Sequence, residues 1–152
     1  MNVPNNARIL VVEDDTAIRA TLVDILELNG FEVVQASNGP DGLERAKAKR
    51  DRPDVILTDV SMPGFDGFEF ITALRAAEET RAIPVIIISA SVEPEKMRQG
   101  MDLGAEDYIV KPFTEDQILG SIRARLEKKA LLDELDAFAH TVAHDLKNPI
   151  AV

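Results

Sequence analysis

The stretch from residue 55 to residue 67 decides the fold, because the apolar run Val55-Ile56-Leu57-Thr58-Asp59 ends in a carboxylate and leads into Met62-Pro63-Gly64-Phe65-Asp66-Gly67. Three other apolar runs also end in polar residues. They are Ile9-Leu10-Val11-Val12 before Glu13-Asp14-Asp15, Val85-Ile86-Ile87-Ile88 before Ser89, and Tyr108-Ile109-Val110 before Lys111-Pro112. Carboxylates, a hydroxyl and an ammonium thus follow successive candidate strands.

Five short runs rich in β-branched residues alternate with helical patterns, and we predict strands at residues 8–12, 32–36, 54–58, 84–88 and 106–110. The runs are nearly continuously apolar, which is typical of strands covered on both faces. Alternating strands and helices indicate an α/β fold with a doubly wound parallel sheet of five strands. Ligands of such sheets bind beyond the carboxyl ends of the strands. One crevice is therefore expected to hold all the polar residues named above.

The first helix should begin at a cap after the acidic cluster, with Thr16 as a plausible capping residue and Asp15 as the alternative. Asn29-Gly30 is a stop signal for this helix. Taken singly, every crevice residue has such a structural explanation: Ser89 could cap a helix, and Lys111 could be a surface charge. Their joint occurrence at matching strand ends favours a functional site.

Composition excludes several classes of protein. The chain has 152 residues, of which 45% are hydrophobic, and no cysteine, so it has neither disulfides nor thiolate metal ligands. Its formal charge of −10 makes it a poor nucleic-acid binder, because it would repel phosphates. No apolar run approaches the roughly 18 residues that a membrane span needs. We expect a cytoplasmic protein with no membrane segment in this piece.

The carboxylates of Glu13, Asp14 and Asp59 should repel one another when they are crowded together, by about 4 kcal/mol for a pair 4 Å apart at an effective dielectric constant near 20. Mg²⁺ would relieve this repulsion, since it takes one or two carboxylates and keeps waters that a phosphate can displace. A carboxylate nucleophile then yields an acyl phosphate. Lys111 would offset charge on the phosphoryl oxygens, and the Ser89 hydroxyl would donate a hydrogen bond to one of them.

Residues from about 7 to 126 resemble a receiver domain of the two-component response-regulator type. The resemblance is carried by Leu-Val-Val-Glu-Asp-Asp, Asp-Val-Ser-Met-Pro-Gly-Phe-Asp-Gly, Ile-Ser-Ala and Tyr-Ile-Val-Lys-Pro-Phe, in this order and at the expected distances. It implies a flavodoxin-like sheet of strand order 2-1-3-4-5, and a histidine protein or kinase domain as the phosphodonor. It also implies a cis Lys111-Pro112 bond.

The same resemblance assigns roles to the crevice residues. Asp59 would be the phosphoacceptor, and Glu13, Asp14, Asp59 and the main-chain carbonyl of Ser61 would organise Mg²⁺. Ser89 would be the switch hydroxyl, and Tyr108 the aromatic that turns inward when Ser89 moves. The alternative for Tyr108 is an ordinary half-buried aromatic.

The remainder of the chain reads as one helix from Thr114 to Asn148, opened by the capping box Thr114-Glu115-Asp116-Gln117. Its first part carries a stripe that should cover the sheet: Ile118, Ile122 and Leu126. After Lys128-Lys129 the apolar residues shift to a heptad seam: Leu132, Leu135, Ala139, Val142 and Leu146. This seam indicates either one long exposed helix or, as we favour, a weak parallel homodimer.

The segment from Phe138 to Pro149 resembles the phosphoacceptor box of histidine kinases. His144 matches the phosphorylated histidine, Asp145 its acid-base neighbour, and Asn148 the water-positioning residue, whereas His140 lacks a following acid. With Val142 and Leu146 on the seam, His144 points outward, where a kinase domain could reach it.

The chain thus reads as a receiver domain, residues 1–126, joined to a coiled-coil linker and a truncated dimerisation helix, residues 127–152, of a hybrid sensor histidine kinase. We expect the intact parent to use ATP and this fragment alone not to do so. The alternative is a receiver with a non-kinase output domain. An aspartate-nucleophile phosphatase is a weaker possibility, because Ser61 stands where a second aspartate would be needed.

Overall fold

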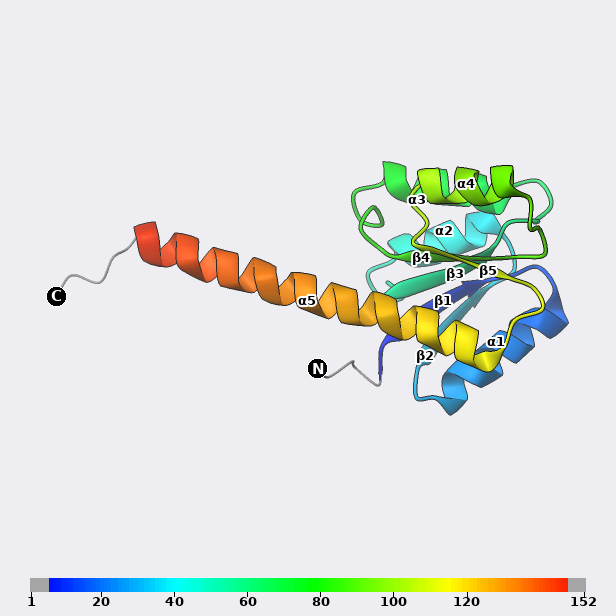
Figure 1. The fold of residues 1–152 in the computed structure, drawn as a ribbon, viewed down its shortest axis with the longest axis horizontal. Coiled ribbons are helices and arrows are strands. Elements are labelled where there is room, and N and C mark those ends of the chain that lie inside the picture. Colours follow the sequence, from blue (N-terminus) through cyan, green and yellow to red (C-terminus); the bar gives the residue numbers. More distant parts are fainter. Residues whose placement is uncertain (1–5, 148–152) are drawn as a thin grey trace.

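Five parallel strands form the centre of the computed structural model, which describes residues 6–147 (Figure 1). They are β1 (Arg8–Val12), β2 (Glu32–Ala36), β3 (Val55–Asp59), β4 (Val85–Ser89) and β5 (Asp107–Val110), and their spatial order is β2-β1-β3-β4-β5. Both the parallel sheet and the strand order are confirmed. The predicted bounds of β1 and β2 are correct, and the other three strands each begin one residue later than predicted.

Helices cover both faces of this sheet. They are α1 (Thr16–Leu28), α2 (Gly39–Lys47), α3 (Gly67–Ala76), α4 (Pro94–Asp102) and α5 (Glu115–Lys147). Figure 1 shows α1 and α5 on one face and α2, α3 and α4 on the other. Each face has its own apolar core, one built around Leu22, Leu26 and Ile122, the other around Phe70 and Leu74. Cover on both faces explains why the strands are continuously apolar.

Local capping fixes where the helices begin. Asp15, not Thr16, caps α1, since its side chain accepts a hydrogen bond from the backbone N–H of Ile18 at 3.0 Å while Thr16 is the first helical residue. Aspartate is the stronger capping residue of the two, because its carboxylate also favours the positive end of the helix dipole. The capping box of α5 is confirmed, with reciprocal hydrogen bonds between Thr114 and Gln117.

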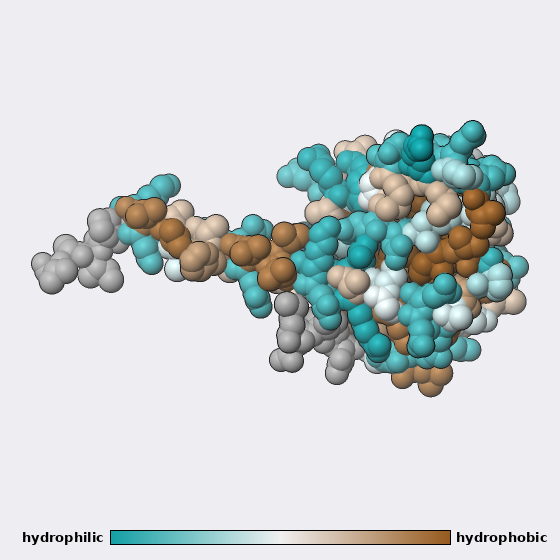
Figure 2. Space-filling view, in the orientation of Figure 1, coloured by the Kyte–Doolittle hydropathy of each residue, from teal (hydrophilic) through white to brown (hydrophobic). Residues whose placement is uncertain are grey.

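Helix α5 has 33 residues and is therefore about 50 Å long, so its second half projects from the domain (Figure 1). Its first half is packed as predicted, with Ile118, Ile122 and Leu126 buried against the sheet. The second half carries an exposed row of large apolar residues, visible as the brown stripe in Figure 2: Leu131, Leu132, Leu135, Phe138, Val142 and Leu146. Within residues 6–147, no helix combines the length and apolar content that a membrane crossing requires.

The backbone approaches itself closely where β3 passes into α3. A Cβ atom at Gly67 would lie 2.7 Å from the Cα of Val60 and closer still to the carbonyl oxygen of Asp59. These neighbours are backbone atoms, which cannot move aside as a flexible side chain would. Gly67 therefore sets how near the start of α3 lies to the end of β3.

Replacing Gly67 with alanine should lower the free energy of unfolding by about 1–3 kcal/mol, as overpacking against fixed atoms does. The matched control is Gly120→Ala, at an exposed position inside α5 where an added Cβ meets nothing within 4 Å. That variant should gain about 0.5–1 kcal/mol from the higher helix propensity of alanine. Urea unfolding followed by circular dichroism measures both, and equal stabilities for the two variants would contradict the close approach.

Candidate functional site

The carboxyl ends of β1, β3, β4 and β5 bring the predicted polar residues into one crevice. Glu13 follows β1, Asp59 ends β3, Ser89 ends β4 and Lys111 follows β5. Because β2 and β3 lie on opposite sides of β1, this edge is where the direction of winding changes and where a crevice opens in such sheets. The expectation that these residues lie at one edge of the sheet is confirmed.

Three carboxylates meet in the crevice. Glu13, Asp14 and Asp59 each offer one oxygen, and these oxygens all lie within 4.8 Å of one another. Glu13 and Asp59 are buried, with 1% and 6% of their surface exposed, while Asp14 is open to solvent. A divalent cation with oxygen preference fits this set, since two buried carboxylates supply charge and the exposed side leaves room for water ligands.

Asp59 is held in a fixed orientation. Its Oδ1 accepts hydrogen bonds from the backbone N–H groups of Val60 at 2.7 Å and Ser61 at 3.2 Å. Its Oδ2 lies 3.4 Å from the Nζ of Lys111. Ser61 and Asp14 also line a cavity of about 450 Å³ at the mouth of the crevice, together with Lys96 of α4. The carboxylate is thus anchored through Oδ1, while Oδ2 faces the ammonium of Lys111.

Lys111 forms an ion pair with Glu13, with its Nζ 2.8 Å from the Oε1 of Glu13. Burial raises the pKa of Glu13 to about 7, even though the hydrogen bond from Lys111 lowers it. Burial by itself would lower the pKa of Lys111, but the hydrogen bond to Glu13 and the charge of Asp59 outweigh it and raise that pKa. The ion pair with Glu13 and Asp59 thus favours the charged form of the Lys111 ammonium. The Lys111-Pro112 bond is cis, as predicted.

Ser89 and Tyr108 meet through a residue that sequence reasoning missed. The buried Ser89 Oγ accepts a hydrogen bond from the backbone N–H of Ser91 at 3.1 Å, and the half-buried Tyr108 hydroxyl donates to the Ser91 carbonyl at 3.0 Å. Arg19 is a second missed contact, since its Nη1 donates to the Glu13 carbonyl at 2.7 Å. Neither residue carries a sequence signal of its own.

The histidine motif lies on the distal part of α5 and takes no part in the crevice. His144 and Asp145 are exposed neighbours, with 3.8 Å between Nδ1 and Oδ1. His140 is exposed as well. Asn148, predicted to position water, lies outside the described residues.

Comparison with known proteins supports the resemblance of the chain to receiver domains. A family model described as the response regulator receiver domain matches residues 9–123. The chain is 41% identical to the protein PilH of Pseudomonas aeruginosa over 120 residues, which are 79% of this chain and 98% of PilH. It is 38% identical to the transcriptional regulatory protein PrrA of Mycobacterium tuberculosis over 80% of its own length. That match spans only 51% of PrrA, about half of the longer protein.

One similar solved structure bears directly on the acidic cluster. The receiver domain of the sensor histidine kinase PA1611 from Pseudomonas aeruginosa was crystallised with a magnesium ion coordinated in its active-site cleft. The chain superimposes on it with a TM-score of 0.74 and 25% sequence identity, over 80% of this chain and 98% of that domain.

Removing one exposed carboxylate should relieve repulsion without disturbing the core. In metal-free buffer, the free energy of unfolding of Asp14→Asn, measured by urea unfolding, should be about 1 kcal/mol higher than that of the unaltered chain. Added Mg²⁺ should stabilise the variant less than it stabilises the unaltered chain. The control is Asp24→Asn, the same charge change at an exposed position of α1. If Mg²⁺ stabilises the Asp14 variant as much as it stabilises the unaltered chain, Asp14 is not a ligand.

Proposed function

The chain belongs to the response regulator receiver domain family, and on this premise we propose that Asp59 accepts a phosphoryl group while Glu13, Asp14 and Asp59 hold Mg²⁺. The main-chain carbonyl of Ser61 completes the proposed ligand set. Membership of the family implies a histidine kinase as the phosphodonor. The observation that carries the proposal is a buried, backbone-anchored Asp59 beside two further carboxylates and 3.4 Å from an ammonium.

The transfer forms a bond between an Asp59 carboxylate oxygen and phosphorus and breaks the bond from phosphorus to the donor group, which leaves with its electron pair. Bound Mg²⁺ supplies positive charge that neutralises the phosphoryl oxygens. The backbone hydrogen bonds to Oδ1 hold the carboxylate in place for attack. Lys111 offsets the charge that the three phosphoryl oxygens bring into the crevice, and it gives up part of its contact with Glu13 to do so.

Ser89 and Tyr108 connect the phosphoryl group to the surface. Ser89 Oγ uses a lone pair to accept the Ser91 N–H, so its own proton is free to be donated to a phosphoryl oxygen. Turning Ser89 toward the phosphate pulls the Ser91 segment with it. Since the Tyr108 hydroxyl is bound to the Ser91 carbonyl, that movement changes the position of Tyr108 as well. The shared contact with Ser91 supports the proposed switch.

Incubation with a small phosphodonor and Mg²⁺ should add one phosphoryl group, measured as a shift of the intact mass. Asp59→Asn should remove the added mass completely, because the nucleophile is gone. Asp14→Asn should still be modified but more slowly, which separates the acceptor from a metal ligand. If the mass of the unaltered chain does not change on incubation with the phosphodonor, the proposal is wrong.

We also propose that the chain is the receiver-bearing part of a hybrid sensor histidine kinase that uses ATP, with His144 as the phosphorylated residue. His144 and Asp145 are adjacent and exposed on the projecting half of α5, where a kinase domain could reach them. A receiver attached to a non-kinase output domain is the alternative. An aspartate-nucleophile phosphatase is less well supported, since Ser61 replaces the second aspartate.

The gene sequence that follows Val152 discriminates between these alternatives. A hybrid kinase should continue with a second apolar helix and then with the nucleotide-binding motifs of an ATP-binding domain. An output domain without such motifs would exclude the kinase and leave the receiver function intact.

We propose further that the chain forms a parallel homodimer through the distal half of α5. Leu132, Leu135, Val142 and Leu146 are 40% to 77% exposed, and no residue of the described chain covers them. An apolar row of this length is typical of an interface rather than of a free surface. Because the seam lasts barely two heptads and includes Ala139, the dimer should be weak.

Sedimentation velocity over a wide concentration range should show a monomer–dimer equilibrium. Leu135→Glu should raise the dissociation constant at least about tenfold, because a carboxylate in the seam loses apolar contact and is desolvated. The control is Leu28→Glu, which alters an equally large apolar residue that is 85% exposed on α1. A monomer up to the highest soluble concentration would refute the dimer.

A further inference from the structure

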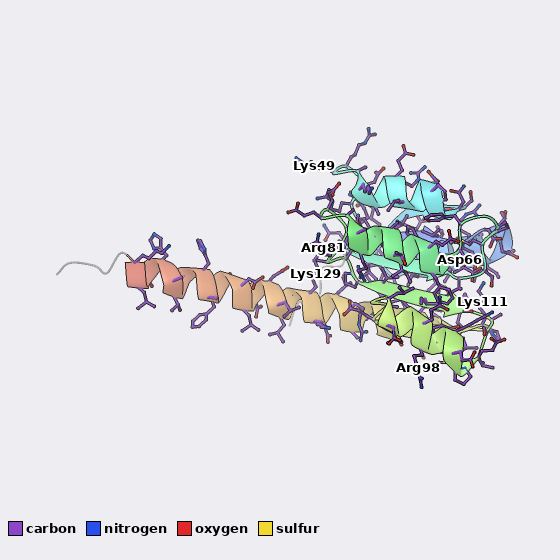
Figure 3. All side chains as sticks on the ribbon, turned by 90° about the horizontal axis from the view of Figure 1, so that it is seen from above. Lys49, Asp66, Arg81, Arg98, Lys111 and Lys129 are labelled. Carbon is purple, nitrogen blue, oxygen red and sulfur yellow. The ribbon has the colours of Figure 1, made fainter. Side chains whose placement is uncertain are left out.

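A second cleft lies at the opposite end of the sheet from the phosphoacceptor crevice, where α5 leaves the domain. Its volume is about 480 Å³, and residues from the α3–β4 connection, the start of β5 and the middle of α5 line it. Five of the lining residues are basic: Arg75, Arg81, Arg125, Lys128 and Lys129. Figure 3 shows Arg81 and Lys129 close to this junction. Three lining residues are acidic: Glu106, Asp133 and Asp136. The lining of the cleft is therefore basic on balance, although the whole chain has a net charge of −10. Lys128 and Lys129 are paired with Glu106 and Asp54, which leaves the arginines.

Two of the three guanidinium groups in this cleft, those of Arg75 and Arg125, are bound to backbone oxygens rather than to carboxylates. Arg75 donates to the carbonyls of Arg81, Ile83 and Gly104, and Arg125 donates to the carbonyl of Glu106. Within residues 6–147 no ion pair involves Arg75, Arg81 or Arg125. The positive charge of the three arginines is therefore not cancelled by direct contact.

The cleft also has an apolar part, formed by Ala82 and Pro84 of the α3–β4 connection and by Leu132 of α5. Leu132 is at the same time the first residue of the exposed seam. The cleft and the seam are therefore continuous, and a helix that pairs along the seam passes the mouth of the cleft.

Heptad geometry tells which side of a partner helix would face the cleft. With Leu132 at position a and Leu135 at position d, Lys129 and Asp136 of the cleft occupy position e. In a parallel pair, the e side of one helix faces the g side of the other at nearly the same height. The g position at this height is Leu131, which is 47% exposed.

Leu131 stands between two acids on the same face of α5. Glu127 precedes it by one turn and Glu134 follows it by three residues, so all three side chains lie together. Both acids are exposed, and neither forms an ion pair within the described part of the chain. An apolar side chain flanked by two carboxylates complements a cleft that has an apolar part and more basic than acidic side chains.

We propose that this cleft receives the g side of α5 from a second copy of the chain, with Leu131 of the second copy against the exposed Ala82 and Leu132 and its two glutamates toward the exposed Arg81. The inference rests on the proposed homodimer and adds the receiver domain itself to the interface. In this arrangement the receiver of each protomer contacts α5 of the other protomer. Both chains then fix the angle between a receiver and its own α5.

Charge exchange tests the contact. Arg81 is exposed and belongs to the receiver, so Arg81→Glu should raise the dissociation constant of the dimer roughly fivefold at low salt, because two attractions become repulsions. The effect should shrink at high salt, since the charges are near the surface. Combining Arg81→Glu with Glu127→Arg and Glu134→Arg should bring the dissociation constant back toward that of the unaltered chain. The control is Arg98→Glu, the same change on the exposed face of α4.

Sedimentation of these three variants and the unaltered chain separates this inference from the dimer on which it rests. A dimer weakened by Arg81→Glu, untouched by Arg98→Glu and restored by the charge exchange supports the cleft contact. A dimer on which Arg81→Glu acts no more than Arg98→Glu overturns the cleft contact and leaves the helical dimer standing. A chain that is monomeric throughout overturns both.

Discussion

The repulsion between carboxylates at the ends of β1 and β3 is the constraint on which the rest of the site depends. Two of the three are buried, and oxygens within 4.8 Å carry a repulsion of about 3.5 kcal/mol per pair of full charges at an effective dielectric constant near 20. Lys111, which follows β5, reduces this repulsion because its ammonium contacts both Glu13 and Asp59. One ammonium cannot neutralise three carboxylates, so the crevice retains an affinity for a divalent cation and, through it, for a phosphoryl group.

Strand β5 connects this electrostatic centre with the base of the long helix. Lys111 follows its carboxyl end, while Glu106 and Asp107 stand at its amino end and contact α5. Asp107 accepts a 2.6 Å hydrogen bond from Ser121, and Glu106 accepts from Arg125 and Lys128. A change in the pairing of Lys111 therefore acts on a strand whose other end holds α5 where it leaves the domain.

The sequence was sufficient for the sheet and for the crevice because both follow from local patterns. Strands covered on both faces are continuous apolar runs, and parallel topology brings their ends together, so the residue after each run could be assigned to one site. Other features depend on contacts that no local pattern records. Ser91 matters only because Ser89 and Tyr108 fold onto it, and the choice of Asp15 over Thr16 as a cap is decided by the exact turn of the backbone.

The cleft at the base of α5 escaped prediction for a different reason, since Arg81 and Arg125 come from distant segments that only the fold brings together. The strict a and d seam also passed over Leu131 and Phe138, which occupy successive g positions and are 47% and 68% exposed. With them the apolar face of α5 is wider than the seam of a two-stranded coiled coil. A second helix covers only part of such a face, and in the proposed dimer the receiver of the other protomer would cover the part at the level of Leu131. Because α5 continues without a break from its packed half to its exposed half, an angle fixed at this level is passed along the whole distal helix to His144.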